Sequence, residues 1–104
     1  MIVPLLLQIT TRTYWPVTVT QLASGHVAHT HVAVTGTVNY VKHESDGDTH
    51  IRLVDGIIFI IAECIPKLPC RIPHVGEHIT IKGISRKDGE HGWWEVHPVE
   101  ELIP

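Results

Sequence analysis

Two segments of the sequence repeat one pattern, an acidic residue followed two positions later by a histidine. Asp48 and His50 lie in "GDTHIRL", and Glu95 and His97 lie in "WWEVHPV". Side chains two residues apart point to the same face of a β-strand, so each pair can present a carboxylate and an imidazole together. These groups are ligands for Zn²⁺ or Mn²⁺, and Glu63, at the end of an apolar run, is a fifth candidate.

A divalent ion held by such residues could activate water for hydrolysis. The predicted metal ligands are Asp48, His50, Glu95 and His97, and the predicted catalytic residues are Glu63 and Asp48. The alternative is that these side chains lie on the wet face of a barrel and serve solubility. Glu63 stands out among them, because a carboxylate beside a core strand needs a partner or a shifted pKa.

A second set of residues is suited to stacking on a ligand. Aromatic rings of single-strand-binding barrels stack on bases beside cationic side chains. The predicted ligand-binding residues are Tyr40, Arg52, Arg86, Lys87 and Trp93. We expect Trp93 to be the platform and Trp94 to pack in the core.

The segment "HVAHTH" places three further histidines at positions 26, 29 and 31. If this segment is extended, His29 and His31 lie on one side. Three histidines can bind zinc, but the spacing matches no common site, and a solvated loop is the favoured interpretation.

The elements that would position these residues are strands rather than helices. Residues 31–44 alternate apolar and polar side chains around Gly36, a glycine that predicts a bulge or bend. "SDGD" predicts a tight turn, since Asp-Gly readily adopts positive φ angles. A second strand covers residues 49–54, and after a turn at Asp55 and Gly56 the apolar run 57–65 predicts a core strand covered on both faces.

The rest of the chain continues this rhythm. Residues 66–78 hold three prolines and no helical period, so they predict a loop. Residues 78–85 predict a fourth strand, residues 86–92 a turn, and residues from 93 a fifth strand that ends near Pro98. Upstream, a short strand is expected at residues 17–20, followed by a loop.

Composition predicts one globular domain, residues 1–104, with a lead-in strand and loop over 1–30 and a barrel over 31–104. The net charge of −3 gives no global positive field for a polyanion, and nine histidines make that charge sensitive to mild acid. The apolar stretches fall short of a membrane span, a signal peptide is not expected, and the cytoplasm is the expected location. A bridge between Cys64 and Cys70 could close a small loop, but in a reducing cytosol two free thiols are the favoured interpretation.

The order of these elements, with "VAVTGTV" in the first strand, resembles an OB-fold over residues 15–103. This resemblance implies an all-β, five-stranded Greek-key barrel with an extra N-terminal strand segment. An SH3-like barrel or a small sandwich is the rival.

Two local likenesses concern the acidic residues. "DGDT" is similar to a hairpin of staphylococcal-type nucleases, which implies a metal-ligand role for Asp48 and places Glu63 near the catalytic acidic region. "GDTHIRL", "IIAECIP" and "WWEVHPV" resemble blocks of small bacterial proteins with an E-x-H-P-V ending. That likeness implies no activity, but it implies that the acid and histidine residues form one pattern.

Three functions follow from these observations. The favoured one is a small OB-type module that binds single-stranded nucleic acid or an oligosaccharide. The second is a metal-dependent, phosphodiesterase-like hydrolase, so whether the protein is an enzyme stays open. The third is an accessory protein without ligand chemistry, whose strand edges pair in a homodimer.

Overall fold

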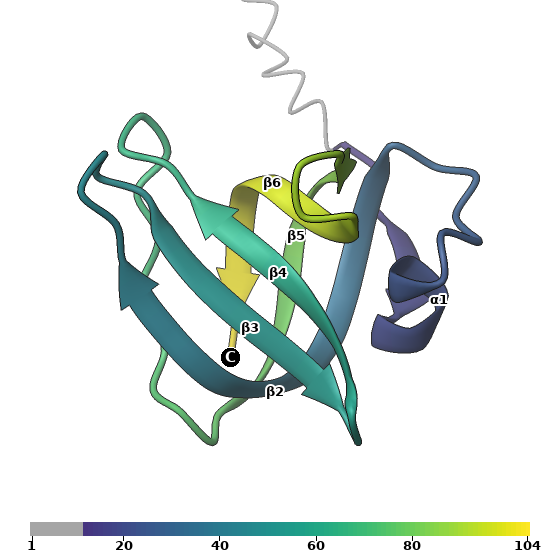
Figure 1. The fold of residues 1–104 in the computed structure, drawn as a ribbon, viewed down its shortest axis with the longest axis horizontal. Coiled ribbons are helices and arrows are strands. Elements are labelled where there is room, and N and C mark those ends of the chain that lie inside the picture. The colour runs from purple at the N-terminus through teal and green to yellow at the C-terminus, as the bar shows by residue number, and fades with distance from the viewer. Residues whose placement is uncertain (1–11) are drawn as a thin grey trace, which may run out of the picture.

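The computed structural model describes residues 12–104, which form a β-barrel with one short helix (Figure 1). The elements in chain order are β1 (Trp15–Thr18), α1 (Val19–Ala23), β2 (His31–His43), β3 (Thr49–Asp55), β4 (Ile58–Cys64), β5 (His78–Asp88) and β6 (Trp93–Ile103). The N-terminal apolar stretch, for which no signal peptide was expected, lies outside the described residues.

Five strands close the barrel. β2, β3 and β4 form an antiparallel meander, β6 runs parallel beside β4, and β5 joins β6 to the first half of β2 (Figure 1). β1 adds a sixth strand, parallel to β2. The predicted all-β, five-stranded OB-like barrel with an extra N-terminal strand is confirmed.

Alternation along the strands separates the core from the outer face. On β3 and β4 the inward side chains include Ile51, Leu53, Ile60 and Ala62, each fully buried. Their neighbours along the chain point outward. β4 is buried on both faces from Ile60 to Cys64, as the apolar run predicts.

The strand expected at residues 17–20 is only half right: β1 covers Val17 and Thr18, but α1 replaces the strand from Val19 on. Thr18 begins the helix with a capping box: its hydroxyl accepts a hydrogen bond from the backbone N–H of Gln21, and the Gln21 side chain accepts one from the backbone N–H of Thr18. Val19 and Leu22 are then buried in the core. The apolar residues of this segment are therefore buried from one short helix and not from a strand.

The last two strands are longer than predicted. β6 continues past Pro98 to Ile103, and β5 continues past Ser85 to Asp88. Gly83 pairs with Val99 and Ser85 with Val96, so β6 holds one extra residue at this point. This bulge places Pro98, which has no N–H, where no ladder hydrogen bond is required.

The bulge expected at Gly36 lies farther along β2, between Val38 and Tyr40. Gly36 instead allows a close approach: a Cβ atom there would lie 3.0 Å from a Val19 methyl and 3.1 Å from the Val54 carbonyl oxygen. By contrast, the tight turn predicted by Asp-Gly is present, with Gly47 at φ +94°.

The two cysteines are joined, which corrects the prediction of free thiols. Cys64 ends β4, and the following loop returns Cys70 to a Cα–Cα separation of 5.9 Å, within the range that a disulfide spans. The loop over residues 66–77 contains no helix, as predicted. Across residues 12–104, no helix has the length and hydropathy that a membrane crossing requires.

Gly83 provides a test of this packing. A Cβ atom there would overlap the Pro98 carbonyl oxygen and lie 2.6 Å from a Val96 methyl, so the β5–β6 ladder would have to shift. We expect Gly83→Ala to lower the free energy of unfolding by about 3 kcal/mol. Gly89→Ala is the control, since no atom lies within 4 Å of a Cβ built there, and it should change stability by less than about 0.5 kcal/mol. Equal effects in urea denaturation would contradict this explanation.

Candidate functional site

The outer face of β3, β4 and β6 brings the predicted acid and histidine residues together. His50 on β3 is the direct cross-strand partner of Glu63 on β4, and one carboxylate oxygen of Glu63 contacts His50 Nε2. The other carboxylate oxygen lies 3.1 Å from Nε2 of His97 on β6. Two imidazoles from separate strands therefore bind one carboxylate.

Two further carboxylates extend these contacts at both ends. Glu44 lies 3.5 Å from His50 Nδ1, and Asp48 lies 3.9 Å from His97 Nε2. The five side chains alternate acid and imidazole in the order Glu44, His50, Glu63, His97 and Asp48, and we call them the acid–histidine chain. Glu63, in the middle, is only 8% exposed.

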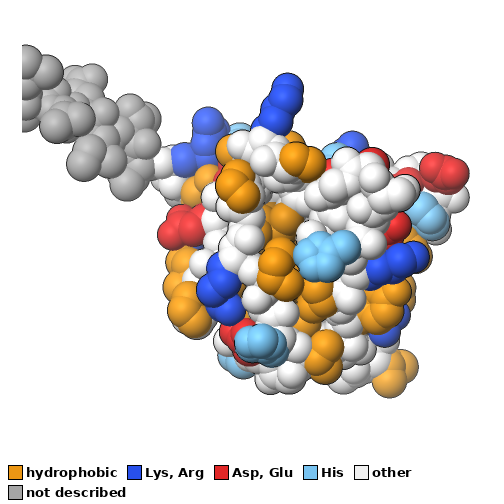
Figure 2. Space-filling model, turned by 90° about the vertical axis from the view of Figure 1, so that its left-hand side faces the viewer, with side chains coloured by type: hydrophobic (Ala, Val, Ile, Leu, Met, Phe, Trp, Pro, Cys, Tyr) orange, Lys and Arg blue, Asp and Glu red, His pale blue; other side chains and the backbone are white. Residues whose placement is uncertain are grey.

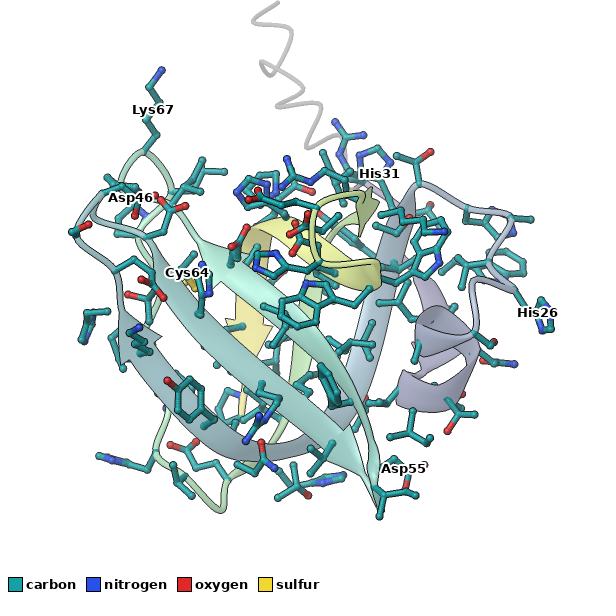
Figure 3. All side chains as sticks on the ribbon, viewed as in Figure 1. His26, His31, Asp46, Asp55, Cys64 and Lys67 are labelled. Atoms are coloured by element: carbon teal, nitrogen blue, oxygen red, sulfur yellow. A yellow bond between two sulfur atoms is a disulfide. The ribbon has the colours of Figure 1, made fainter. Side chains whose placement is uncertain are left out.

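A hollow of about 470 Å³ opens beside this chain, between the β2–β3 and β5–β6 hairpins. Figure 3 shows Asp46 at the tip of the first hairpin, with Asp55 at the opposite end of β3. The carboxylates that line the hollow are those of Glu44, Asp46, Glu63, Asp88 and Glu90. The hollow is thus suited to a cation rather than to a free phosphate.

Burial raises the pKa of Glu63 above its ordinary value, and the nearby negative charge of Glu95 raises it further. The imidazoles of His97 and His50 act in the opposite direction. Burial and Glu95 raise the pKa more than the imidazoles lower it, so ionisation of Glu63 lowers the stability of the folded state.

Glu95 does not join the acid–histidine chain, although it shares a face with His97. It is 1% exposed and accepts two hydrogen bonds from Arg86, at 2.7 and 3.1 Å. Arg86, predicted as a ligand-binding residue, is therefore engaged by a buried carboxylate. Among the predicted residues, Asp48, Glu63 and His97 form the compact metal-ligand group, with all three ligand atoms within 4.8 Å of one another.

A row of rings and one cation crosses the same outer face, and we call it the stacking row: Tyr40, Arg52, Phe59 and Trp93. The Arg52 guanidinium lies 5.0 Å from the Tyr40 ring centroid and 5.8 Å from that of Phe59. Phe59 packs edge-on against Trp93 at 5.8 Å. Tyr40 is 42% exposed, so its ring is accessible from solvent.

The structure separates Lys87, another predicted binding residue, from this row. Lys87 pairs with Trp94 across the β5–β6 ladder, so it lies on the opposite face from Trp93. Trp94 packs against the core, as expected. Phe59 was missed because it stands in an apolar run, although its alternation with buried Ile60 indicates an outward position.

Trp93 has two features that the sequence does not indicate. The His91 ring stacks on the Trp93 ring with 4.4 Å between the ring centroids. His91 Nδ1 in turn lies 2.7 Å from a carboxylate oxygen of Asp88. Its indole Nε1 is buried and has no hydrogen-bond partner among residues 12–104. One face of the predicted platform is therefore already occupied by an imidazole.

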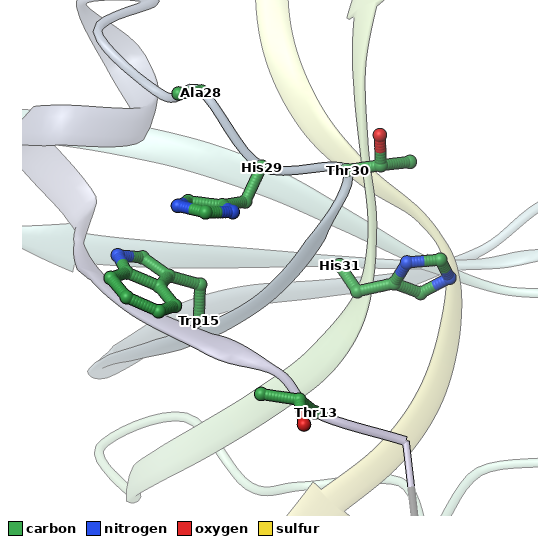
Figure 4. Close-up of a pocket in the computed structure, with 6 residues that line it drawn as sticks. All are labelled: Thr13, Trp15, Ala28, His29, Thr30 and His31. Atoms are coloured by element: carbon green, nitrogen blue, oxygen red, sulfur yellow. The ribbon is translucent and has the colours of Figure 1, made fainter.

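The histidines of "HVAHTH" do not converge. Figure 4 shows the rings of His29 and His31 pointing in different directions from the chain. Residues 24–30 form an exposed loop rather than a strand, as the favoured interpretation predicts. His29 stacks on Trp15 at 4.2 Å, while His31 contacts Arg12 at 3.0 Å. Both histidines line a hollow of about 500 Å³.

The surface is of mixed character. On the face drawn in Figure 2, acidic, basic and apolar side chains are intermingled. This agrees with the net charge of −3 and means that electrostatic attraction of a polyanion must be local.

Comparison with protein-family models gives no match, and neither does comparison with curated proteins. Several solved structures match. A chain described as an aspartyl-tRNA synthetase from Leishmania major Friedlin aligns over 97% of this chain with a TM-score of 0.69 and 13% identity. Asparaginyl-tRNA synthetase from Pyrococcus horikoshii aligns over 83%, with a TM-score of 0.67 and 16% identity.

The present chain spans 22% of each synthetase chain. It spans 79% of the telomere capping protein Ten1 from Saccharomyces pombe, which aligns over 84% of this chain with a TM-score of 0.57 and 19% identity. Neither the nuclease likeness of "DGDT" nor the E-x-H-P-V pattern finds support in these comparisons. The barrel topology and these likenesses together identify the fold as an OB-fold.

The buried Arg86–Glu95 pair yields a stability prediction. Arg86→Met leaves the buried Glu95 carboxylate without its cation. We expect a loss of about 2 to 3 kcal/mol in the free energy of unfolding. This loss is smaller than for a fully buried pair because the Arg86 side chain is half exposed. Arg86→Met combined with Glu95→Gln should recover part of this loss. The control is Arg71→Met, which breaks the exposed pair with Glu77 and should cost much less.

The raised pKa of Glu63 yields a pH prediction. The folded state binds the Glu63 proton more tightly than the unfolded state does. The free energy of unfolding therefore falls as the pH rises from 4.5, the ordinary pKa of a glutamate, through the raised pKa of Glu63 in the folded state. Glu63→Gln removes this titration. Measured with a chelator present, the variant should gain stability relative to wild type as the pH rises.

The control for this measurement is Glu77→Gln. Its hydrogen bonds from Arg71 lower the pKa of Glu77, so Glu77 contributes stability above its ordinary pKa that is lost as the pH falls. The Glu77→Gln variant should therefore lose stability relative to wild type as the pH rises. Slopes of the same sign in the two variants would refute the assignment for Glu63.

Proposed function

We propose that this chain is an OB-type module that binds single-stranded nucleic acid across the stacking row. The observation that carries the proposal is the continuity of Tyr40, Arg52, Phe59 and Trp93 over four neighbouring strands on one outer face. OB-folds bind oligonucleotides on the corresponding strands, between the loops that here are the β2–β3 and β5–β6 hairpins.

The named structural likenesses support a nucleic-acid ligand. By their printed names, two of the matched chains are tRNA synthetases and a third caps telomeres. Since a tRNA and a telomere are both nucleic acids, the matched barrels belong to proteins that act on this class of polymer. The oligosaccharide ligand, the hydrolase and the accessory protein find no such support.

The charges on the face favour contact with bases rather than with phosphates. Arg52 is the only cation in the stacking row, and the neighbouring hollow is acidic. A bound strand would therefore place its bases on the rings and its backbone toward solvent, away from the hollow. Because few phosphates would be neutralised, the logarithm of affinity should fall with the logarithm of salt concentration with a slope of only about −1.

A hydrogen bond fixes the Arg52 side chain in a position from which it could contact such a ligand. Its Nε donates a hydrogen bond to the Asn39 side-chain oxygen at 2.8 Å, which leaves the guanidinium over the Tyr40 ring. A base could stack on the exposed Tyr40 while a base edge or phosphate accepts a hydrogen bond from the guanidinium.

A cytoplasmic location and a homodimer stay predictions.

An oligonucleotide titration tests this function. We expect dT and rU oligonucleotides to quench tryptophan fluorescence, with Tyr40→Ala weakening binding about 5- to 150-fold through the loss of one stacked base. Trp15→Ala is the matched control, because Trp15 is 50% exposed but stacks on His29, outside the row. No binding at about 100 μM oligonucleotide, or equal effects of the two variants, would contradict the proposal.

A further inference from the structure

We infer that Asp48, Glu63 and His97 bind one divalent cation of the zinc or manganese class at the edge of the acidic hollow. This site is separate from the stacking row and does not depend on nucleic-acid binding. It differs from the ligand set that the sequence suggests, because Glu95 is engaged by Arg86 and Glu63 takes its place.

The distances fit a small ion. For metal–ligand bonds of about 2.1 Å, tetrahedral geometry separates neighbouring ligand atoms by about 3.4 Å. The His97 Nε2 atom lies 3.1 Å from Glu63 and 3.9 Å from Asp48, on either side of that value. All three ligand atoms lie within 4.8 Å of one another, so a rearrangement of about 1 Å or less per side chain completes three corners.

Rigid elements hold these three side chains. Glu63 and His97 belong to strands β4 and β6, and Asp48 directly precedes β3. The backbone N–H of Asp48 donates to the Asp46 side chain at 3.0 Å, which fixes the turn that carries Asp48. Glu63 is 8% exposed, and the Asp48 and His97 side chains are about one-fifth exposed, so these are not freely solvated surface acids.

His50 supports the site from outside it. Metal-binding carboxylates are commonly oriented by a second group, and His50 contacts the carboxylate oxygen of Glu63 that faces away from His97. Glu44 in turn lies beside the other ring nitrogen of His50. His50 is therefore a positioning residue for Glu63 in this proposal.

The ligand types select among cations. One imidazole and two carboxylates suit Zn²⁺ or Mn²⁺, whereas Ca²⁺ and Mg²⁺ favour oxygen ligands alone. Three protein ligands also leave one position open on a tetrahedral ion, for a water molecule or a phosphate oxygen.

The experiment measures the metal alone, without oligonucleotide, on the full chain treated with a chelator and dialysed. Calorimetric titration with Zn²⁺ should show one site, and Mn²⁺ should broaden the amide signals of residues 48, 63 and 97 before any others. Asp48→Asn and His97→Gln should each weaken Zn²⁺ binding by at least about tenfold, and His50→Gln by about tenfold. Circular dichroism and thermal melts confirm that each variant is folded.

Nine histidines make stray zinc binding a real alternative, so two controls matter. Asp55→Asn makes the same change at the opposite end of β3, outside the lining of the hollow, and His29→Gln removes a histidine of "HVAHTH". Both should leave Zn²⁺ affinity unchanged. The inference is overturned if folded Asp48→Asn and His97→Gln proteins bind as tightly as wild type, if either control abolishes binding, or if no saturable binding occurs. Each of these results leaves the oligonucleotide titration unaffected.

Discussion

Closure of the barrel is the constraint on which the rest of the structure depends. Once the inward residues of β3 and β4 are packed with those of β6 in one core, every alternate side chain on these strands must point outward. His50, Glu63 and His97 become neighbours because strands β3, β4 and β6 are adjacent in the sheet and their registers bring these residues level. A shift of one residue in any pairing would reverse both faces and remove the site.

Two kinds of chemistry share this outer face. The stacking row offers rings and one guanidinium, while the acid–histidine chain offers carboxylates and imidazoles beside an acidic hollow. The stacking row attracts a polyanion, whereas the carboxylates of the acid–histidine chain and the hollow repel it. A cation bound at the edge of the hollow would reduce this repulsion. The proposed metal site and the proposed nucleic-acid surface are therefore physically compatible, although each can be tested alone.

Buried charge is handled differently at two neighbouring glutamates. Glu95 has a direct partner in Arg86, whereas Glu63 is flanked by the imidazoles of His50 and His97. Burial raises the pKa of Glu63, and the charge of Glu95 adds to this effect.

The sequence by itself determined the five strands of the barrel, their inward and outward faces and the Asp-Gly turn, because period-two alternation and glycine chemistry are local properties. The barrel itself was implied by the resemblance to OB-folds, and the tertiary structure decided against an SH3-like barrel or a sandwich. The sequence did not determine α1, since a helix of five residues leaves almost no periodic signal, or the joining of Cys64 to Cys70. It also did not distinguish Glu63 from Glu95 as the partner of His97. Only the tertiary structure decided that, because the contact depends on which strands lie side by side and on the capture of Glu95 by Arg86.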